Sequence, residues 1–204
     1  MMGRLNIRGL MIAGSAVVVL AACSEDPGPR PNTTTPSLVL TSGVEPPPDD
    51  HDEFFDKVRD LEFERAVSWN ARDFSRPELQ QEMPSYAVEP LSVTAARMEP
   101  AVVPGPATLR LISFVEISED RIQLEVCRSL PGEPAREPGP HRYGYDIVQT
   151  DRGDWEISSY GTYPGPLVTC DIEDAPRYIF DPAPEPNTHP VIGPDGEHVE
   201  WPGQ

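Results

Sequence analysis

Residues 107–127 read ATLRLISFVEISEDRIQLEVC, and this stretch decides the fold that the sequence predicts. Apolar and polar residues alternate along 107–117 and again along 122–127, which is the two-residue period of a β-strand with one buried face. The polar residues 118–120 between the two runs predict a tight turn, so the stretch is interpreted as a β-hairpin. In its first strand we expect one face to carry Leu109, Leu111, Ser113, Val115 and Ile117, and the other Arg110, Ile112, Phe114 and Glu116.

A second hairpin is predicted further along the chain. Its strands are expected at 142–150 and 155–160, because the same alternation returns there. The turn between them contains Gly153, which adopts a positive φ without steric cost. Upstream of the first hairpin, residues 92–98 are interpreted as a weaker strand. One face of the strand 142–150 is expected to carry Tyr143, Tyr145 and Ile147.

The chain before the hairpins predicts helices. After residue 50, apolar residues recur at helical spacing, and a second apolar stripe lies on the opposite side of the same helix. A helix that is apolar on two sides is either well buried or kinked, here near Asn70. Asp50 and Glu53 are interpreted as its N-terminal capping pair, and a short second helix is expected from Pro77 to Met83. The first stripe consists of Phe54, Phe55, Val58, Leu61, Ala66 and Trp69, and the second of Phe63, Val67 and Phe74.

Helices followed by two consecutive hairpins indicate an α+β fold, in which helices cover one face of an antiparallel sheet. Over residues 51–162 this order of elements resembles the cystatin-like and NTF2-like domains, in which an N-terminal helix and a short helix precede a curved β-meander. The resemblance implies a pocket between helix and sheet. Some domains of this kind are enzymes and many only bind, so the fold does not select between the two.

The N-terminal residues are interpreted as a targeting signal. Arg4 and Arg8 precede a short apolar segment, residues 10–20, which is too short to span a bilayer permanently. The following Leu20-Ala21-Ala22-Cys23 resembles the lipobox of bacterial lipoproteins. That resemblance implies that residues 1–22 are removed as a signal peptide and that Cys23 carries acyl chains. The implied location is the extracytoplasmic face of the cell membrane, as in exported lipoproteins of actinobacteria; an ordinary secretory signal is the alternative.

Composition divides the rest of the chain into a body and two flanks. Proline accounts for 26 of the 204 residues. It is concentrated in 23–50 and 176–204, which are expected to be a disordered tether and a disordered acidic tail. The body between them, residues 51–175, has the size of one ordinary domain. The net charge of −18 argues against nucleic-acid binding, because that function requires basic surfaces.

The number of cysteines is consistent with an exported protein. The lipobox uses Cys23, which leaves Cys127 and Cys170 as a pair. In an oxidising compartment this pair is expected to form a disulfide, with two free thiols as the alternative. A zinc site is not expected, because the two cysteines lack the spacing and the neighbouring histidines of metal ligands.

No catalytic motif stands out in the sequence. The acidic residues around His51, 49–53, are interpreted as helix-capping residues and not as metal ligands, because adjacent helical residues do not converge on one point. The strand residues His141, Tyr143, Tyr145 and Asp146 are interpreted as parts of an ordinary half-buried strand, and Trp69 and Trp155 as core. We therefore expect no catalytic residue, no metal and no cofactor.

The sequence leads us to expect a lipid-anchored binding module of the cell envelope and not an enzyme. Its expected partners are the membrane, through Cys23, and an envelope protein or a small apolar ligand. The alternative is a small enzyme that uses a pocket between helix and sheet. A buried titratable cluster lining a deep pocket would favour the enzyme, whereas a filled core with an exposed apolar patch would favour the binding module.

Overall fold

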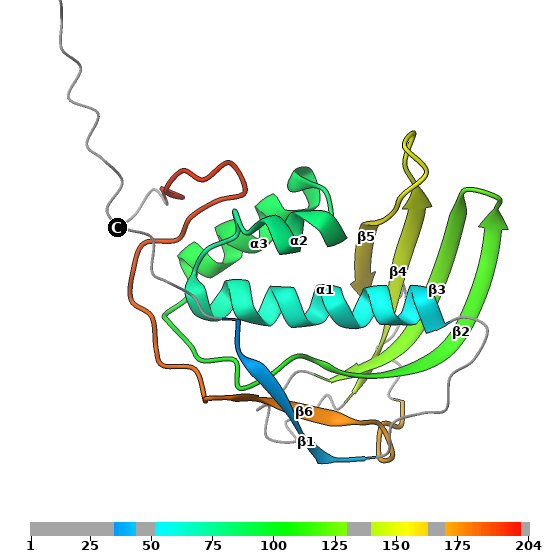
Figure 1. The fold of residues 1–204 in the computed structure, drawn as a ribbon, viewed down its shortest axis with the longest axis horizontal. Coiled ribbons are helices and arrows are strands. Elements are labelled where there is room, and N and C mark those ends of the chain that lie inside the picture. Colours follow the sequence, from blue (N-terminus) through cyan, green and yellow to red (C-terminus); the bar gives the residue numbers. More distant parts are fainter. Residues whose placement is uncertain (1–34, 44–51, 130–139, 163–169, 201–204) are drawn as a thin grey trace, which may run out of the picture. The chain divides into compact units, whose positions relative to one another are not determined.

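The computed structural model describes residues 35–43, 52–129, 140–162 and 170–200. This part of the chain contains three helices and two antiparallel sheets, which is the α+β class that the sequence predicts (Figure 1). None of the described helices is long and apolar enough to cross a membrane. The elements in chain order are β1 (Ser37–Ser42), α1 (Asp52–Ala71), α2 (Pro77–Glu82), α3 (Ser85–Arg97), β2 (Thr108–Ser118), β3 (Arg121–Ser129), β4 (His141–Gln149), β5 (Trp155–Thr162) and β6 (Arg177–Asp181).

The larger sheet contains both predicted hairpins. Its strands follow the order β2-β3-β4-β5, and each pair is antiparallel. Leu124 lies opposite Tyr145, and Ile122 lies opposite Ile147, so the alternation predicted for these strands is confirmed. Gly153, in the turn between β4 and β5, has a φ of 89°, as expected for that position. The buried side chains of one sheet face form the main core together with α1.

The predicted faces of β2 are wrong beyond Leu111. The register between β2 and β3 shifts between Leu111 and Ser113. An irregularity of this kind inserts an extra residue and reverses which side chains point toward the core. Phe114 therefore lies opposite Leu124 and packs against the core, whereas Val115 is 45 % exposed.

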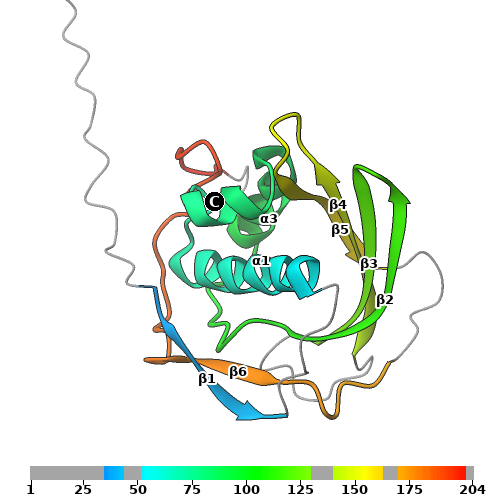
Figure 2. The same cartoon turned by 45° about the vertical axis from the view of Figure 1, so that its right-hand side comes forward.

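The flanks of the body contribute a second, two-stranded sheet. Strand β1 pairs with β6 in antiparallel register, with Leu38 opposite Phe180 and Val39 opposite Ile179. We call this pair of strands the ribbon (Figures 1 and 2). Phe180 is only 2 % exposed. The expectation of a disordered tether and tail is therefore wrong for β1 and β6; residues 1–34, 44–51 and 201–204 lie outside the described residues.

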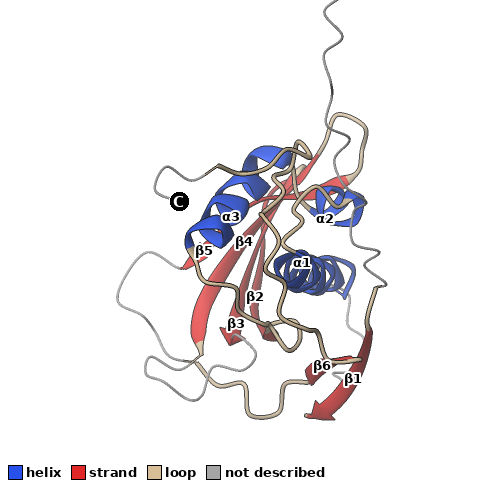
Figure 3. Ribbon diagram, turned by 90° about the vertical axis from the view of Figure 1, so that its left-hand side faces the viewer, coloured by secondary structure: helices blue, strands red, loops and turns tan. Residues whose placement is uncertain are grey.

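Helix α1 is buried on two sides, which explains its two apolar stripes. The predicted stripe that includes Leu61 belongs to the core on the larger sheet, except for Ala66. Phe63 and Val67 of the opposite stripe pack, together with Ala66, in a cluster with Phe180 of the ribbon, whereas Phe74 belongs to the main core. Figure 3 shows α1 nearly end-on, with the larger sheet on one side and the ribbon on the other. The helix continues through Asn70 to Ala71, so burial is the alternative that the structure adopts and the kink is not.

Helix α3 replaces the strand that was predicted at 92–98. The β-branched residues Val93 and Thr94 favour a strand locally. The buried residues of this segment nevertheless recur at helical spacing, and a helix places all of them against the core. They are Val88, Ser92, Ala95 and Ala96. The short helix expected from Pro77 is confirmed as α2, which ends at Glu82 before the extended Met83.

The segment after β6 also packs on the body. Val191 is 2 % exposed and belongs to the main core. The neighbouring Ile192 donates its backbone N–H to the Arg72 carbonyl at 2.9 Å and accepts one from Phe74 at 2.9 Å. The prediction of a disordered tail therefore also fails around residues 191–192, where the chain closes over the end of α1.

Candidate functional site

The interior between α1 and the larger sheet contains an ionic cluster. Glu62 of α1 accepts hydrogen bonds from Arg128 Nη2 at 2.8 Å and from the Tyr145 hydroxyl at 2.7 Å. Arg65, one turn further along α1, donates to Glu62 Oε1 at 2.5 Å. Both carboxylate oxygens of Glu62 are therefore occupied by donors from this chain.

Tyrosine rings surround the two guanidinium groups of this cluster. The Arg65 guanidinium carbon lies 4.5 Å from the centroid of the Tyr160 ring, and that of Arg128 lies 4.8 Å from the Tyr143 ring. Tyr143, Tyr145 and Tyr160 lie with their ring centroids 5.8 to 6.1 Å apart. The cluster holds two cations and one anion, and contacts with ring faces stabilise the additional positive charge.

The cluster shifts the pKa values of its members. Burial raises the pKa of Glu62. The charges of Arg128 and Arg65 and the hydrogen bonds from Arg128 and Tyr145 lower this pKa by more than burial raises it, so the result is about 2. Burial and the Glu62 carboxylate raise the pKa of Tyr145 well above its usual value of 10.0. The ionised carboxylate and the neutral phenol are thus the forms that the interior favours.

These properties make the cluster a structural unit and a poor catalytic site. Glu62 is 3 % exposed and Tyr145 is 0 % exposed, so an external ligand does not reach either group in this structure. A carboxylate with a pKa of about 2 is also a weak general base at neutral pH. A buried titratable cluster, which would have favoured an enzyme, is present, but external ligands have no access to it. The Glu62 carboxylate neutralises one of its two guanidinium charges, which leaves a net charge of +1.

Glu62 and Arg128 were not predicted as site residues, although the position of Arg128 in the sequence was a signal of its burial. Arg128 occupies the next inward position of β3 after Leu124 and Val126, so its charge faces the core. A charged residue at an inward position requires a buried partner. Glu62 left no comparable signal, because it lies beside Leu61 in a helix that is apolar on two sides.

The residues that the sequence singled out on β4 do not converge on one site. Tyr145 lies on the inner face, as predicted, and contacts Glu62. Asp146 lies on the opposite face, where it accepts hydrogen bonds from Arg121 at 3.2 Å and from Ser159 at 2.8 Å. Trp155 packs edge-on against Phe54, with ring centroids 5.2 Å apart, in the partly buried rim of the core.

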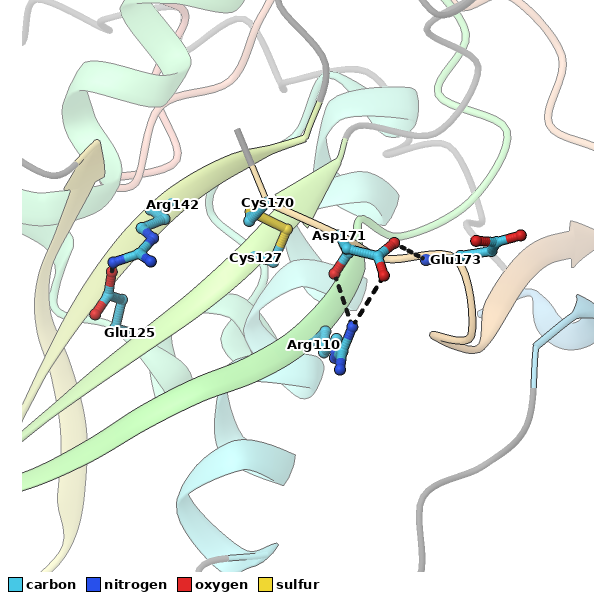
Figure 4. Close-up of a disulfide and its surroundings, with 7 residues drawn as sticks. All are labelled: Arg110, Glu125, Cys127, Arg142, Cys170, Asp171 and Glu173. Carbon is cyan, nitrogen blue, oxygen red and sulfur yellow. Dashed lines mark hydrogen bonds and ion pairs between the residues drawn. A yellow bond between two sulfur atoms is a disulfide. The ribbon is translucent and has the colours of Figure 1, made fainter. Parts of the chain in front are cut away.

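The predicted disulfide joins Cys127 of β3 to Cys170 (Figure 4). The two Cα atoms are 5.8 Å apart. Cys127 is fully buried under Ile172 and Ala175, so the bond attaches residues 170–175 to the outer face of the sheet. Asp171 of the same segment contacts Arg110 at 3.4 Å, which gives this attachment an exposed ionic contact as well.

A polar cleft lies between α1, α2 and the turn from β4 to β5. Its volume is about 780 Å³. Lys57, which lies in it, is paired with Glu82 at 2.7 Å. Trp155 and Phe54 contribute its aromatic surface. We call it the acidic cleft, because six carboxylates line it: Glu53, Asp56, Asp60, Glu82, Asp154 and Glu156.

A second hollow, of about 620 Å³, separates the ribbon from α1 and the start of β2. We call it the ribbon groove. Its charged groups come from a single helix, α1, and are Asp56, Arg59 and Asp60. Burial raises the pKa of Asp60, and the carboxylates of Glu82 and Asp56 raise it further. The rest of the wall is mainly apolar and includes Pro36, Leu38, Phe63, Pro106, Leu109 and Tyr178.

The remaining predictions about sites fall partly outside the described residues. Cys23 and the acidic residues 49–51 lie outside them. Within the described ranges, no three histidine, cysteine, aspartate or glutamate side chains are grouped so that they could hold a metal ion. Comparisons with protein families, with curated proteins and with solved structures found no match to this chain.

Proposed function

We propose that this protein is a lipid-anchored binding module on the extracytoplasmic face of the cell membrane. The order of basic residues, apolar segment and Leu20-Ala21-Ala22-Cys23 supports the anchor. The bond between Cys127 and Cys170 is consistent with an oxidising compartment outside the cytoplasm. Acyl chains on Cys23 would hold the module at the membrane and raise its effective concentration toward partners there.

The ribbon groove is the observation that carries the binding function. Ligand sites in proteins are typically hollows of about 300–1,000 Å³ with apolar walls and a few polar groups, and the groove, at about 620 Å³, has this character. The exposed apolar residue Leu38 lies in its wall. The function that this geometry supports best is binding of an apolar group from an envelope protein or a small apolar ligand.

The alternative is a small enzyme, and one observation favours it. Asp60 lies where the ribbon groove and the acidic cleft meet, and its raised pKa is a property of many catalytic carboxylates. Asp60 is exposed, however, and the groove wall around it is mainly apolar. Binding therefore remains the function that we propose.

Mass spectrometry of the mature N-terminus tests the anchor. We expect a chain that begins at Cys23 and carries acyl chains, and a Cys23→Ala variant that is unprocessed or released from the membrane. A mature protein that begins at another residue with an unmodified Cys23 would remove the lipid anchor from the proposal.

A neutral apolar dye, N-phenylnaphthylamine, tests the groove. The chain from Thr33 onward serves for this test once circular dichroism and thiol titration show that it folds with its disulfide. We expect Leu38→Ser, in the groove wall, to weaken dye binding severalfold. Val39→Ser is the matched control, because the two residues are 40 % and 42 % exposed but point to opposite faces of β1. Equal binding by both variants, or no binding at all, would contradict a site in the groove.

A further inference from the structure

Strand β1 has one unpaired edge in the part of the chain that the structure describes. Its backbone pairs with β6 on one side, and all six of its residues are exposed. An unpaired edge presents a row of N–H and C=O groups with which another chain can form a ladder. The edge of β1 is therefore available for an added strand.

The other edge of the ribbon is closed. The backbone N–H of Phe180 in β6 donates to the Pro104 carbonyl at 2.9 Å. Gly105 lies so close to β6 that a Cβ atom built on it would be 2.3 Å from the Tyr178 carbonyl oxygen. A further strand thus adds beside β1 and not beside β6.

The sequence of β1 lacks the features that usually protect an edge strand. Its residues, SLVLTS, include no charge, no proline and no glycine, whereas natural edges are commonly protected by lysine, proline or inward-pointing charges. Leu38, Val39 and Leu40 are 40 %, 42 % and 47 % exposed. In a chain with a net charge of −18, this neutral apolar edge is a surface suited to contact with another polypeptide chain.

The ribbon groove beside β1 indicates the side chains that an added strand would carry. Leu38 belongs both to β1 and to the groove wall, so a strand along β1 would lie next to the groove. Arg59 is already paired with Asp56 at 2.9 Å. Asp60 has no ion pair among the described residues and lies at the same groove, so a basic side chain would complement it.

We propose that β1 binds an extended segment of a partner protein as an added strand. The segment carries apolar residues and one basic residue at the alternating positions that face the ribbon groove, as in other cases of β-strand addition. This inference rests on the proposed binding function and names its partner class. A second copy of this chain would also satisfy the edge of β1, but it would bring two chains of net charge −18 together.

The test uses the full-length chain in zwitterionic lipid nanodiscs and a blocked synthetic peptide, Thr-Val-Thr-Val-Thr-Lys-Thr-Val-Thr. Calorimetry measures binding, with empty nanodiscs as background, and hydrogen exchange locates it. Two further peptides carry N-methyl groups on the threonines or on the intervening residues. Because each set of amides faces one edge of the peptide strand, we expect one set to weaken binding by about tenfold or more and the other to leave it nearly unchanged.

Variants of the protein test the contact with Asp60. Asp60→Asn should weaken binding of the lysine peptide about threefold, and added salt should reduce this effect. Asp151→Asn is the matched control, because it removes the same charge in the exposed turn between β4 and β5. Hydrogen exchange should slow in Ser37–Ser42 when the peptide is present.

Three outcomes would overturn the inference. They are no binding, binding that neither set of N-methyl groups weakens, and a dimer whose β1 is protected without peptide, which would make a second copy the occupant. If one of these outcomes is observed but dye binding still distinguishes Leu38→Ser from Val39→Ser, only the peptide partner is rejected. If dye binding also fails, the proposed binding function is rejected with it.

Discussion

The Glu62 carboxylate and the Arg128 guanidinium are hydrogen-bonded at 2.8 Å, although 66 residues separate them in the chain. The pair joins α1 to β3 across the interior, and Tyr145 extends the connection to β4. Its position is where the resemblance to NTF2-like domains implied a pocket. In this protein that position is filled, and the acidic cleft and the ribbon groove lie outside the core.

Replacing Glu62 should strongly destabilise the fold. Glu62→Gln leaves the buried guanidinium of Arg128 without its counter-charge, and breaking a buried ion pair in this way costs about 3–5 kcal/mol. Urea denaturation measures the change in the free energy of unfolding. Glu89→Gln, at an exposed position of α3, is the control and should change it by less than about 0.5 kcal/mol. Equal effects of the two substitutions would contradict the role assigned to Glu62.

Acid should remove the contribution of Glu62 to stability. Its pKa in the folded chain is about 2, below the ordinary value of 4.5, so folding favours the ionised form. The contribution is therefore complete above pH 4.5 and is lost as the pH falls toward 2. Asp60 and Glu64 act in the opposite sense, because their pKa values are raised.

Denaturation of the wild type and of Glu62→Gln at a series of pH values isolates this effect. The difference in unfolding free energy between the two chains should shrink steadily below pH 4.5. A difference that stays constant down to pH 2 would show that the pKa of Glu62 is not lowered by folding.

Loss of the disulfide should loosen one segment first. Reduction or Cys170→Ser releases a bond that closes a sequence separation of 43 residues, and bonds of this kind typically contribute about 2–4 kcal/mol. We expect a lower melting temperature and faster hydrogen exchange in 170–175 than in the two hairpins. Cys23→Ala leaves this bond intact and should melt like the unaltered chain.

The segment after β6 should contribute to the stability of the core. Val191→Ala removes two buried methyl groups at a position that is 2 % exposed, and a loss of about 2 kcal/mol is expected. Val115→Ala makes the same chemical change at a position that is 45 % exposed and should have little effect. Thermal melts of the two variants compare them directly. If Val191→Ala melts like Val115→Ala, the segment does not pack as described.

Local patterns in the sequence were sufficient for much of the fold. The alternation at 122–127, the glycine at 153 and the proline that opens α2 each act over a few neighbouring residues, so they remain readable without the structure. The strand predicted at 92–98 is wrong. The β-branched Val93 and Thr94 favour a strand locally, but the segment belongs to a helix whose buried face begins earlier, at Val88. Strand preference there yields to packing against the core.

The sequence by itself determined the α+β class and the two hairpins, because periodicity is a local property, and it left a bond between Cys127 and Cys170 as an expectation that the structure confirms. Only the tertiary structure decided that β1 and β6 meet and cover the second stripe of α1. It also decided that Phe114 turns inward and that Glu62 meets Arg128. These features depend on contacts between segments far apart in the chain, where the free energy of burial and ion pairing is gained only after the whole fold has formed.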